Sequence, residues 1–169
     1  MKQSDQSKQY MVEALLALMK EKPYNLISVK DITEKAGVAR LTFYRNFETK
    51  EDIIRHHLRM DFQEYMEQLT QIADLDLKQM VTLCYTFWGN RKEEIRLISA
   101  HSMGWLLREP FEEFLQQILQ QMKLIDQYTY FQQEFLIGGM FSDMLAWIDD
   151  PQGRTPEDMA TEILEIFKV

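Results

Sequence analysis

The stretch "VKDITEKAGVARLTFYRNFETKEDII", residues 29–54, reads as two short helical segments separated by a glycine. Ser28 precedes the first segment and Asp31 follows three residues later, a pairing that can satisfy the free amide groups at a helix start. Gly37 stands where a helix end needs a left-handed residue. A short helix, a three-residue turn and a second short helix have the spacing of a helix-turn-helix.

The second segment has one apolar side and one polar side. At about 100° per residue, Phe43 and Phe47 fall together, whereas Leu41, Arg45 and Asn46 fall opposite them. We expect the two phenylalanines to bury against the first helices while the polar side faces a partner. Such a helix can read base edges, because arginine donates two bonds to guanine and an apolar side chain contacts the thymine methyl group. The same geometry occurs in helical corners that bind no DNA, so spacing alone leaves both interpretations open.

Composition and charge place limits on the function. The 169 residues are 46% hydrophobic with only 6 Gly and 4 Pro, which indicates a folded chain. Residues 1–60 hold 11 Lys/Arg against 8 Asp/Glu, a net charge of +3, and residues 61–169 hold 8 against 19, a net charge of −11. A basic first third favours a polyanionic partner. We assign the lone Cys84 to core packing, and a single cysteine is typical of a reducing compartment. The sequence shows no signal peptide and no long apolar run, so we expect a soluble cytoplasmic protein without a membrane segment.

Apolar residues recur three or four positions apart along the whole chain, which predicts an all-α protein. We expect a first helix that ends near residues 21–23 and a long helix from residue 50 to about 73–74. Further helices are expected at 76–88, 91–106, 110–123, 127–149 and 156–168, with a loop at "DDPQGRTP", residues 149–156. The expected organisation is a DNA-binding domain over residues 1–50 and a helical regulatory and dimerisation domain over residues 51–169.

The run from Val29 to Ile54 resembles the TetR (tetracycline-repressor) family of bacterial regulators. It carries the Ile-x-x-x-Ala-Gly-Val turn, the Thr-aromatic-Tyr core and the aromatic-x-x-Lys-x-x-aliphatic entry to the next helix. The resemblance implies an all-α homodimer with an N-terminal helix-turn-helix head and a C-terminal body that binds a small-molecule inducer. The implied base contacts are Arg40, Leu41 and Thr42, and the implied phosphate contacts are Ser28, Tyr44, Asn46 and Lys50. Leu41 and Asn46 depart from the commoner Gly and His of the family, which suggests a different operator and a shorter phosphate contact.

Two adjacent glycines interrupt an otherwise strong helix, at Gly138 and Gly139. Each costs about 1 kcal/mol relative to alanine, so close helix–helix approach is expected to compensate. We predict half of a four-helix dimer interface, formed by Phe131, Phe135, Gly138, Gly139, Phe141, Ile163 and Ile166. The alternative is that the glycines let another helix of the same subunit pack closely.

The body is rich in methionine and aromatic side chains that could line a ligand cavity. The candidates are Phe62, Met66, Cys84, Trp88, His101, Met103 and Trp105. Such residues are also ordinary core material, because methionine fills irregular gaps and aromatic rings dominate burial. His101 is the most useful polar candidate, although a lone histidine more often bonds a backbone carbonyl. His56 and His57 are adjacent and point to different faces, which makes them a poor metal pair.

The leading hypothesis is therefore a DNA-binding repressor that binds a palindromic operator as a homodimer and responds to a small-molecule ligand. The alternative is a TetR-like protein-interaction module or coregulator with little DNA affinity of its own. We expect no enzymatic activity, no cofactor and no metal site, because the chain carries no phosphate loop, zinc-ligand spacing or nucleophile–base signature.

Overall fold

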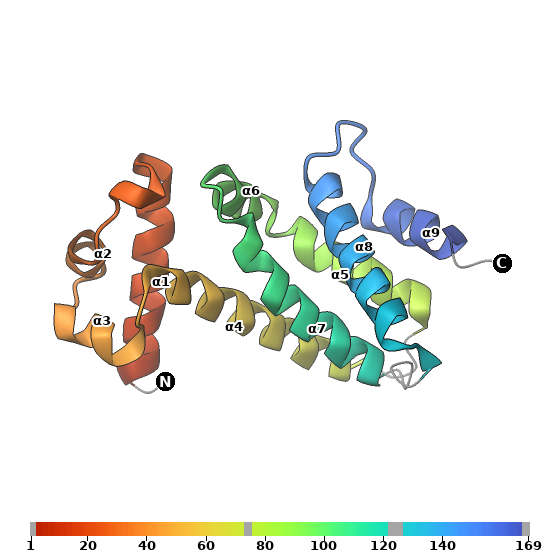
Figure 1. The fold of residues 1–169 in the computed structure, drawn as a ribbon, viewed down its shortest axis with the longest axis horizontal. Helices are drawn as coiled ribbons and strands as arrows, with labels where there is room; N and C mark the ends of the chain where they lie inside the picture. Colours follow the sequence, from red (N-terminus) through yellow and green to blue (C-terminus); the bar gives the residue numbers. More distant parts are fainter. Residues whose placement is uncertain (1–2, 73–75, 122–126, 167–169) are drawn as a thin grey trace. The chain divides into compact units, whose positions relative to one another are not determined.

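The computed structural model describes residues 3–72, 76–121 and 127–166, and within these ranges it contains helices and turns but no strand (Figure 1). The elements are α1 (Gln3–Glu21), η1 (Tyr24–Leu26), α2 (Val29–Ala36), α3 (Arg40–Asn46), α4 (Lys50–Thr70), α5 (Leu77–Gly89), α6 (Lys92–Ala100), η2 (Gly104–Leu107), α7 (Arg108–Gln121), α8 (Tyr130–Ile148) and α9 (Pro156–Ile166). The predicted all-α class is confirmed. No helix in the described ranges combines the length and the hydrophobicity needed to cross a bilayer.

The chain forms two compact units. The first comprises residues 1–62 and 97–110, and the second comprises residues 63–96 and 111–169. The continuous helices α4, α6 and α7 pass from one unit into the other. The sequence-based division at residue 50 falls inside the first unit, which also takes in the first turns of α4 and the segment 97–110.

The core of the first unit forms where α1 packs against α2 and α3 (Figure 1). Met11 and Leu15 of α1 are fully buried, as are Ile32 of α2 and Phe43 of α3. The Phe43 ring lies 6.1 Å from the ring of Phe47, which is also buried. Burial of the two phenylalanines, predicted from the helical wheel, is confirmed, and it fixes which side of α3 remains exposed.

The turn between α2 and α3 has the helix end at Gly37 that the sequence predicted. Gly37 adopts a left-handed φ of 67°, and the Val38 amide donates to the Thr33 carbonyl at 3.0 Å, which is the hydrogen-bond pattern of a Schellman motif. At the other end of α2, Ser28 and Asp31 form the predicted capping box. Local hydrogen bonds therefore fix both ends of α2, and they set the direction in which α3 begins.

The second unit is built around aromatic contacts. α5 packs mainly against α9 and also against α8. The Tyr85 ring of α5 meets the Trp147 ring of α8 edge-on at 5.1 Å, and Trp88 lies 5.8 Å from Phe111 of α7. Cys84 is buried among these residues, as predicted, and burial raises the pKa of its thiol to about 12. The thiol is therefore protonated core material at neutral pH.

The predicted extent of the helix over residues 91–106 is wrong, because α6 ends at Ala100. Ser102 adopts a left-handed φ of 59°, and the Met103 amide donates to the Ile98 carbonyl at 3.1 Å. A serine instead of a glycine makes this helix end, which leaves little signal in the sequence. α8 begins at Tyr130 behind a Thr129–Gln132 capping box rather than at residue 127. The predicted helix ends near residues 73–74, 123 and 168 lie outside the described residues.

Candidate nucleic-acid interface

α3 presents large side chains to solvent. Its buried residue is Phe43, whereas Leu41 and Tyr44 are each 59% exposed. The Tyr44 ring stands edge-on against Phe43 at 5.2 Å, so the buried ring orients the exposed one. A leucine and a tyrosine left in solvent on one helix face, in a chain with an ample core, indicate a contact surface.

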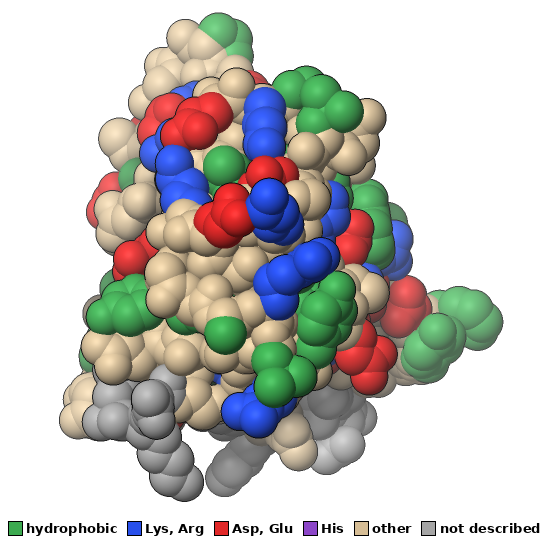
Figure 2. Space-filling model, turned by 90° about the vertical axis from the view of Figure 1, so that its left-hand side faces the viewer, with side chains coloured by type: hydrophobic (Ala, Val, Ile, Leu, Met, Phe, Trp, Pro, Cys, Tyr) green, Lys and Arg blue, Asp and Glu red, His purple; other side chains and the backbone are tan. Residues whose placement is uncertain are grey.

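The arginines of α3 are available for a partner. Arg40 and Arg45 are exposed, and neither has an ion-pair partner among the residues that the structure describes. Neighbouring lysines are instead paired: Lys22 lies 3.0 Å from Asp31, and Lys35 lies 2.7 Å from Glu21. Figure 2 shows this face, on which Lys and Arg side chains lie among Asp and Glu. Unpaired guanidinium groups on an exposed helix suit base edges and phosphates.

The predicted phosphate contact Ser28 is engaged in the α2 cap. Its Oγ accepts a bond from the Asp31 amide at 3.1 Å and donates to Asp31 Oδ2 at 2.8 Å. The Ser28 amide, the Lys22 ammonium and the Ser28 hydroxyl hold the pKa of Asp31 well below its usual range. Ser28 therefore has a structural role in the capping box, and its phosphate contact stays a prediction.

Asn46 is likewise bonded inside the first unit. Its Oδ1 accepts from Ser4 Oγ at 2.8 Å, and its Nδ2 donates to the Thr42 carbonyl at 2.7 Å. The bond from Ser4 ties the end of α3 to the start of α1, and the bond to Thr42 holds the side chain against α3. The side chain therefore supports the placement of α3 directly, a role that the sequence did not indicate.

Lys50 holds the turn between α1 and α2. Its Nζ donates to the Tyr24 carbonyl at 3.1 Å and to the Ile27 carbonyl at 2.5 Å, and it lies 4.2 Å from the centre of the Tyr24 ring. Burial lowers the pKa of Lys50 from its usual value. The phosphate contact of Lys50 stays a prediction. Its two hydrogen bonds also give this lysine a structural role in the turn.

The sequence of this head matches a known family. Residues 11–56 match bacterial regulatory proteins of the tetR family. The head is therefore a TetR-type DNA-binding domain. The chain is a DNA-binding transcriptional regulator of this type, built on the helix-turn-helix of α2 and α3.

Two solved structures share the fold of this chain. Lin0861 from Listeria innocua is 16% identical, with a TM-score of 0.81 over 97% of this chain and 90% of that one. The dihydroxyacetone kinase operon activator DhaS is 17% identical, with a TM-score of 0.60 over 95% of this chain and 93% of that one. At this identity the likeness concerns the fold. No curated protein sequence matches the chain.

His101, a predicted pocket residue, joins the segment 97–110 to the TetR-type head. Its Nε2 lies 2.7 Å from the Met19 carbonyl, and its Nδ1 accepts the Tyr24 amide at 3.2 Å. An accepting Nδ1 and a donating Nε2 define the neutral tautomer. The expectation that a lone histidine bonds a backbone carbonyl is confirmed. One bond reaches the last turn of α1, and the other reaches Tyr24 in the turn that Lys50 also holds.

The other predicted pocket residues divide between the two units. Phe62 and Met103 are buried in the first unit, where Trp105 is exposed with the Arg55 guanidinium 5.4 Å from its ring. Met66, Cys84 and Trp88 belong to the second unit. The ligand pocket that combines all seven stays a prediction.

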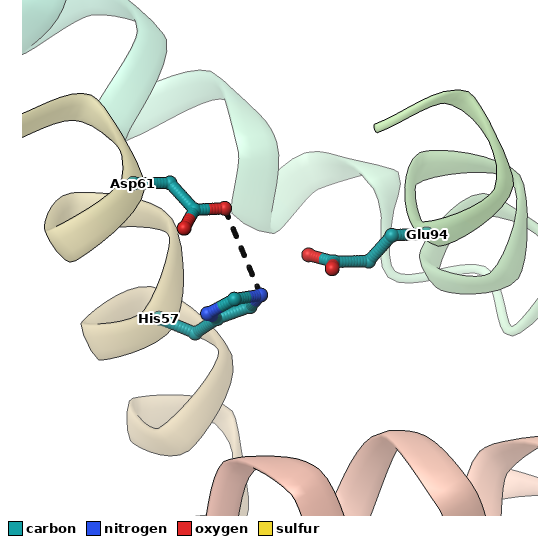
Figure 3. Close-up of side chains that lie close together, drawn as sticks. All are labelled: His57, Asp61 and Glu94. Atoms are coloured by element: carbon teal, nitrogen blue, oxygen red, sulfur yellow. Dashed lines mark ion pairs between the residues drawn. The ribbon is translucent and has the colours of Figure 1, made fainter. Parts of the chain in front are cut away.

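The two adjacent histidines of α4 point to different neighbours, as predicted. The His56 ring lies 5.7 Å from Phe47, and burial lowers its pKa. Figure 3 shows His57 turned toward Asp61 one turn along the same helix, with Nε2 and Oδ2 3.7 Å apart. One histidine therefore packs against the core of the head, and the other pairs with a carboxylate.

A second exposed surface lies on α8 and α9. Phe131 is 81% exposed and Phe135 is 75% exposed, and Ile166 is also exposed. A groove of about 200 Å³ runs between the two helices, with Gly139 in its lining. A Cβ atom added to Gly138 or Gly139 would meet no atom within 4 Å. Intramolecular packing in the described structure therefore does not require the glycines.

Two of the predicted interface residues are instead used inside the subunit. The Phe141 ring packs 5.3 Å from Phe111, and Ile163 is buried although it also lines the groove. The exposed part of the surface is therefore narrower than the sequence predicted, and it follows Phe131, Phe135 and Gly139 along α8.

Proposed function

We propose that this TetR-family regulator is a repressor that binds a palindromic operator as a homodimer and is controlled by a small-molecule ligand. Three observations support the proposal: the exposed face of α3, the exposed apolar stripe of α8, and the His101 link between the segment 97–110 and the head. The observation on which the dimer chiefly rests is the unfilled space around Gly138 and Gly139.

The base-reading surface consists of Arg40, Leu41 and Thr42, at the N-terminal end of α3. A recognition helix in the major groove contacts bases with its N-terminal residues. Tyr44 and Arg45 lie one turn further along, where a hydroxyl and an unpaired guanidinium can bind phosphate oxygens. In this proposal Ser28, Asn46 and Lys50 act on DNA partly by fixing α3.

The dimer surface is a stripe along one side of α8. Phe131, Phe135, Gly139, Ser142 and Ala146 are all exposed and recur at intervals of three or four residues. The first two side chains are large and the last three are small. A stripe that is large at one end and small at the other is complementary to an antiparallel copy of itself.

The sequence spacing gives a definite register for that pairing. If a two-fold axis passes between Gly138 and Gly139, Phe131 lies opposite Ala146 of the partner subunit, and Phe135 lies opposite Ser142 of the partner subunit. Each phenylalanine then meets a small residue, and the glycines let the two backbones approach at the crossing. The helix cost of about 1 kcal/mol for each glycine would thus be offset by closer packing between subunits.

Cysteine cross-linking tests this register. In a Cys84→Ala background, mixing Phe135→Cys protein with Ser142→Cys protein should yield a mixed disulfide dimer, because disulfides need Cα atoms within about 7 Å. The matched control mixes Phe135→Cys with Phe131→Cys, whose positions would lie about 16 Å apart along the antiparallel pair. Equal cross-linking in both mixtures, or none in either, contradicts the proposed interface.

Operator binding is tested by selecting duplexes from random DNA and measuring mobility shifts over a range of salt concentrations, with Tyr44→Ala as the control. The proposal predicts an inverted-repeat consensus and an affinity that falls steeply with salt, since each neutralised phosphate releases counterions. A symmetrical consensus also supports a dimer, because half-site spacing reflects the two-fold axis of the protein.

Control by a ligand is supported by the connection through His101. A ligand that shifts the segment 97–110 would also move a side chain bonded to Met19 and Tyr24, at the turn that leads into α2. The DNA-binding state would then change with ligand occupancy, provided that the ligand binds the two states with different affinity.

The second candidate function is a coregulator that docks on another protein and has little DNA affinity of its own. The observation in its favour is that Ser28, Asn46 and Lys50 are already bonded within the first unit. Charge reversal at Arg40 and Arg45 discriminates the two functions. It abolishes salt-sensitive DNA binding by a repressor, whereas a coregulator has no such binding to lose.

A further inference from the structure

A small apolar cavity lies within the second unit, apart from the residues that the sequence proposed for ligand binding. Its volume is about 110 Å³, and its described lining comes from α5, α7, α8 and α9 together with Tyr128. Val81, Leu115 and Leu119 contribute buried walls. Apart from Tyr128, every described lining side chain is aliphatic or a methionine.

We propose that this cavity binds a small neutral molecule of about one aromatic ring, with the Tyr128 hydroxyl as its hydrogen-bonding contact. The inference rests on the proposed control by a ligand, and it names a site and a ligand class in the second unit that act on dimerisation rather than through His101. An apolar protein cavity of about 150 Å³ accepts benzene. The space here is smaller but opens to the surface beside the half-exposed Leu77, so it suits at most one ring, with any small substituent projecting outward.

The described lining disfavours charged ligands. No charged side chain faces the space among its described residues, and an ion moved there from water would lose part of its hydration without a counter-charge from them. The Tyr128 hydroxyl has no hydrogen-bond partner within the described ranges, and it can act as donor or acceptor. A phenol-like molecule fits both features, because it is apolar over most of its surface and carries one hydroxyl group.

The cavity shares a wall with the groove on the α8 and α9 surface. Leu136, Met140 and Ile163 line both spaces. A ligand in the cavity therefore restricts side chains that line the groove beside the proposed dimer stripe of α8. Occupancy and dimerisation are coupled through these three residues, and thermodynamic linkage requires that each changes the affinity of the other by the same factor.

Phenol and toluene are the probes, because they differ only by a hydroxyl in place of a methyl group. The assay uses the full chain with ¹³C-labelled methionine methyl groups, and it follows the Met140 signal during titration. Both probes should shift this signal saturably. Tyr128→Phe should weaken phenol binding at least threefold and leave toluene binding unchanged.

Cavity-filling variants provide the structural control. Leu119→Phe should weaken both probes at least tenfold, whereas Leu26→Phe, at an exposed position in the first unit, should weaken neither. Leu77→Phe, at a half-exposed wall position, makes the same test if Leu119→Phe does not fold. Probe binding that persists in a folded cavity-filled variant, or that never saturates in the native protein, overturns the site.

Coupling to dimerisation is measured by sedimentation equilibrium with and without phenol. We expect the dimer dissociation constant to change at least threefold, and not to change in the cavity-filled variant. An unchanged constant in the presence of saturating phenol overturns the shared-wall coupling. Operator binding is measured separately with the Tyr44→Ala control, so a chain that binds operator but neither probe refutes this inference and leaves the proposed function standing.

Discussion

Replacing both glycines of α8 with alanine should stabilise the monomer and weaken the dimer. A Cβ at Gly138 or Gly139 has free space within the described structure, and alanine is better than glycine inside a helix by about 1 kcal/mol. The Gly138→Ala/Gly139→Ala variant should therefore gain about 2 kcal/mol as a monomer. For a chain of this size, that gain raises Tm by about 4–8 °C.

The dimer should respond in the opposite direction. At a close crossing the two subunits together bring four added methyl groups into the interface, and overpacking a well-packed contact costs about 1–3 kcal/mol. We expect the dimer dissociation constant to rise at least tenfold. Sedimentation equilibrium measures that constant, and urea unfolding at protein concentrations below dimerisation measures the monomer.

Gly153→Ala is the matched control. Gly153 also has open space around its Cα, but its φ is 67°, a conformation that alanine adopts with strain. This variant should destabilise the monomer and leave dimerisation unchanged. If the double variant leaves the dimer dissociation constant unchanged, the glycines do not lie at the subunit crossing. If it destabilises the monomer, the inference of free space around them is wrong.

Three further predictions concern the head. Arg40→Ala should weaken operator binding by about 1–3 kcal/mol and relax the preference at one base pair per half-site, measured on substituted operators. Lys50→Met should remove two hydrogen bonds from a charged donor and destabilise the head by about 1.5–3 kcal/mol. Hydrogen exchange at residues 24–27 should then become faster. Weaker DNA binding with unchanged exchange would instead show that Lys50 acts on phosphate alone. Asp31→Asn should destabilise the protein at neutral pH. The pKa of Asp31 is depressed in the folded state, so the ionised carboxylate stabilises the fold above about pH 4, and this stabilisation is lost as the pH falls further. Urea unfolding at several pH values should therefore show the free energies of unfolding of the native protein and the variant becoming equal in acid.

The features that could be predicted from the sequence are those fixed by local chemistry. Gly37 marks the end of α2 because few other residues adopt its φ, and Ser28 marks the start because its oxygen caps an amide three residues later. The 3.6-residue period placed Phe43 and Phe47 inside and left Leu41 exposed. None of these inferences needs information from a distant part of the chain.

The features that could not be predicted depend on distant partners. Nothing near Asn46 in the sequence indicates that Ser4 will donate to it, and the bond from Lys50 to the Ile27 carbonyl depends on how η1 folds back. The left-handed Ser102 is a local feature, but serine rarely takes that conformation, so the break after α6 carries no strong signal.

The proposed ligand site shows a different limit of sequence-based prediction. Methionine and aromatic residues mark a core without marking which spaces in it stay unfilled, because a cavity is a shortfall of volume summed over several helices. The predicted residues Cys84 and Trp88 are buried as ordinary core, whereas the cavity of the second unit is lined by leucines such as Leu115 and Leu119, which nothing distinguished in the sequence.

The distribution of charge predicts that the proposed dimerisation strengthens DNA binding. In the head, Lys22, Lys30 and Lys35 pair with carboxylates, so its net charge overstates the cations available to DNA. The available guanidinium groups of α3 are those of Arg40 and Arg45, and a head with so few free cations should bind DNA weakly by itself. In the proposed dimer, the two joined heads would engage the second half-site at a high effective concentration, which multiplies the affinity without any new contact. Any ligand that loosens the α8 surface would therefore weaken operator binding while leaving both recognition helices intact.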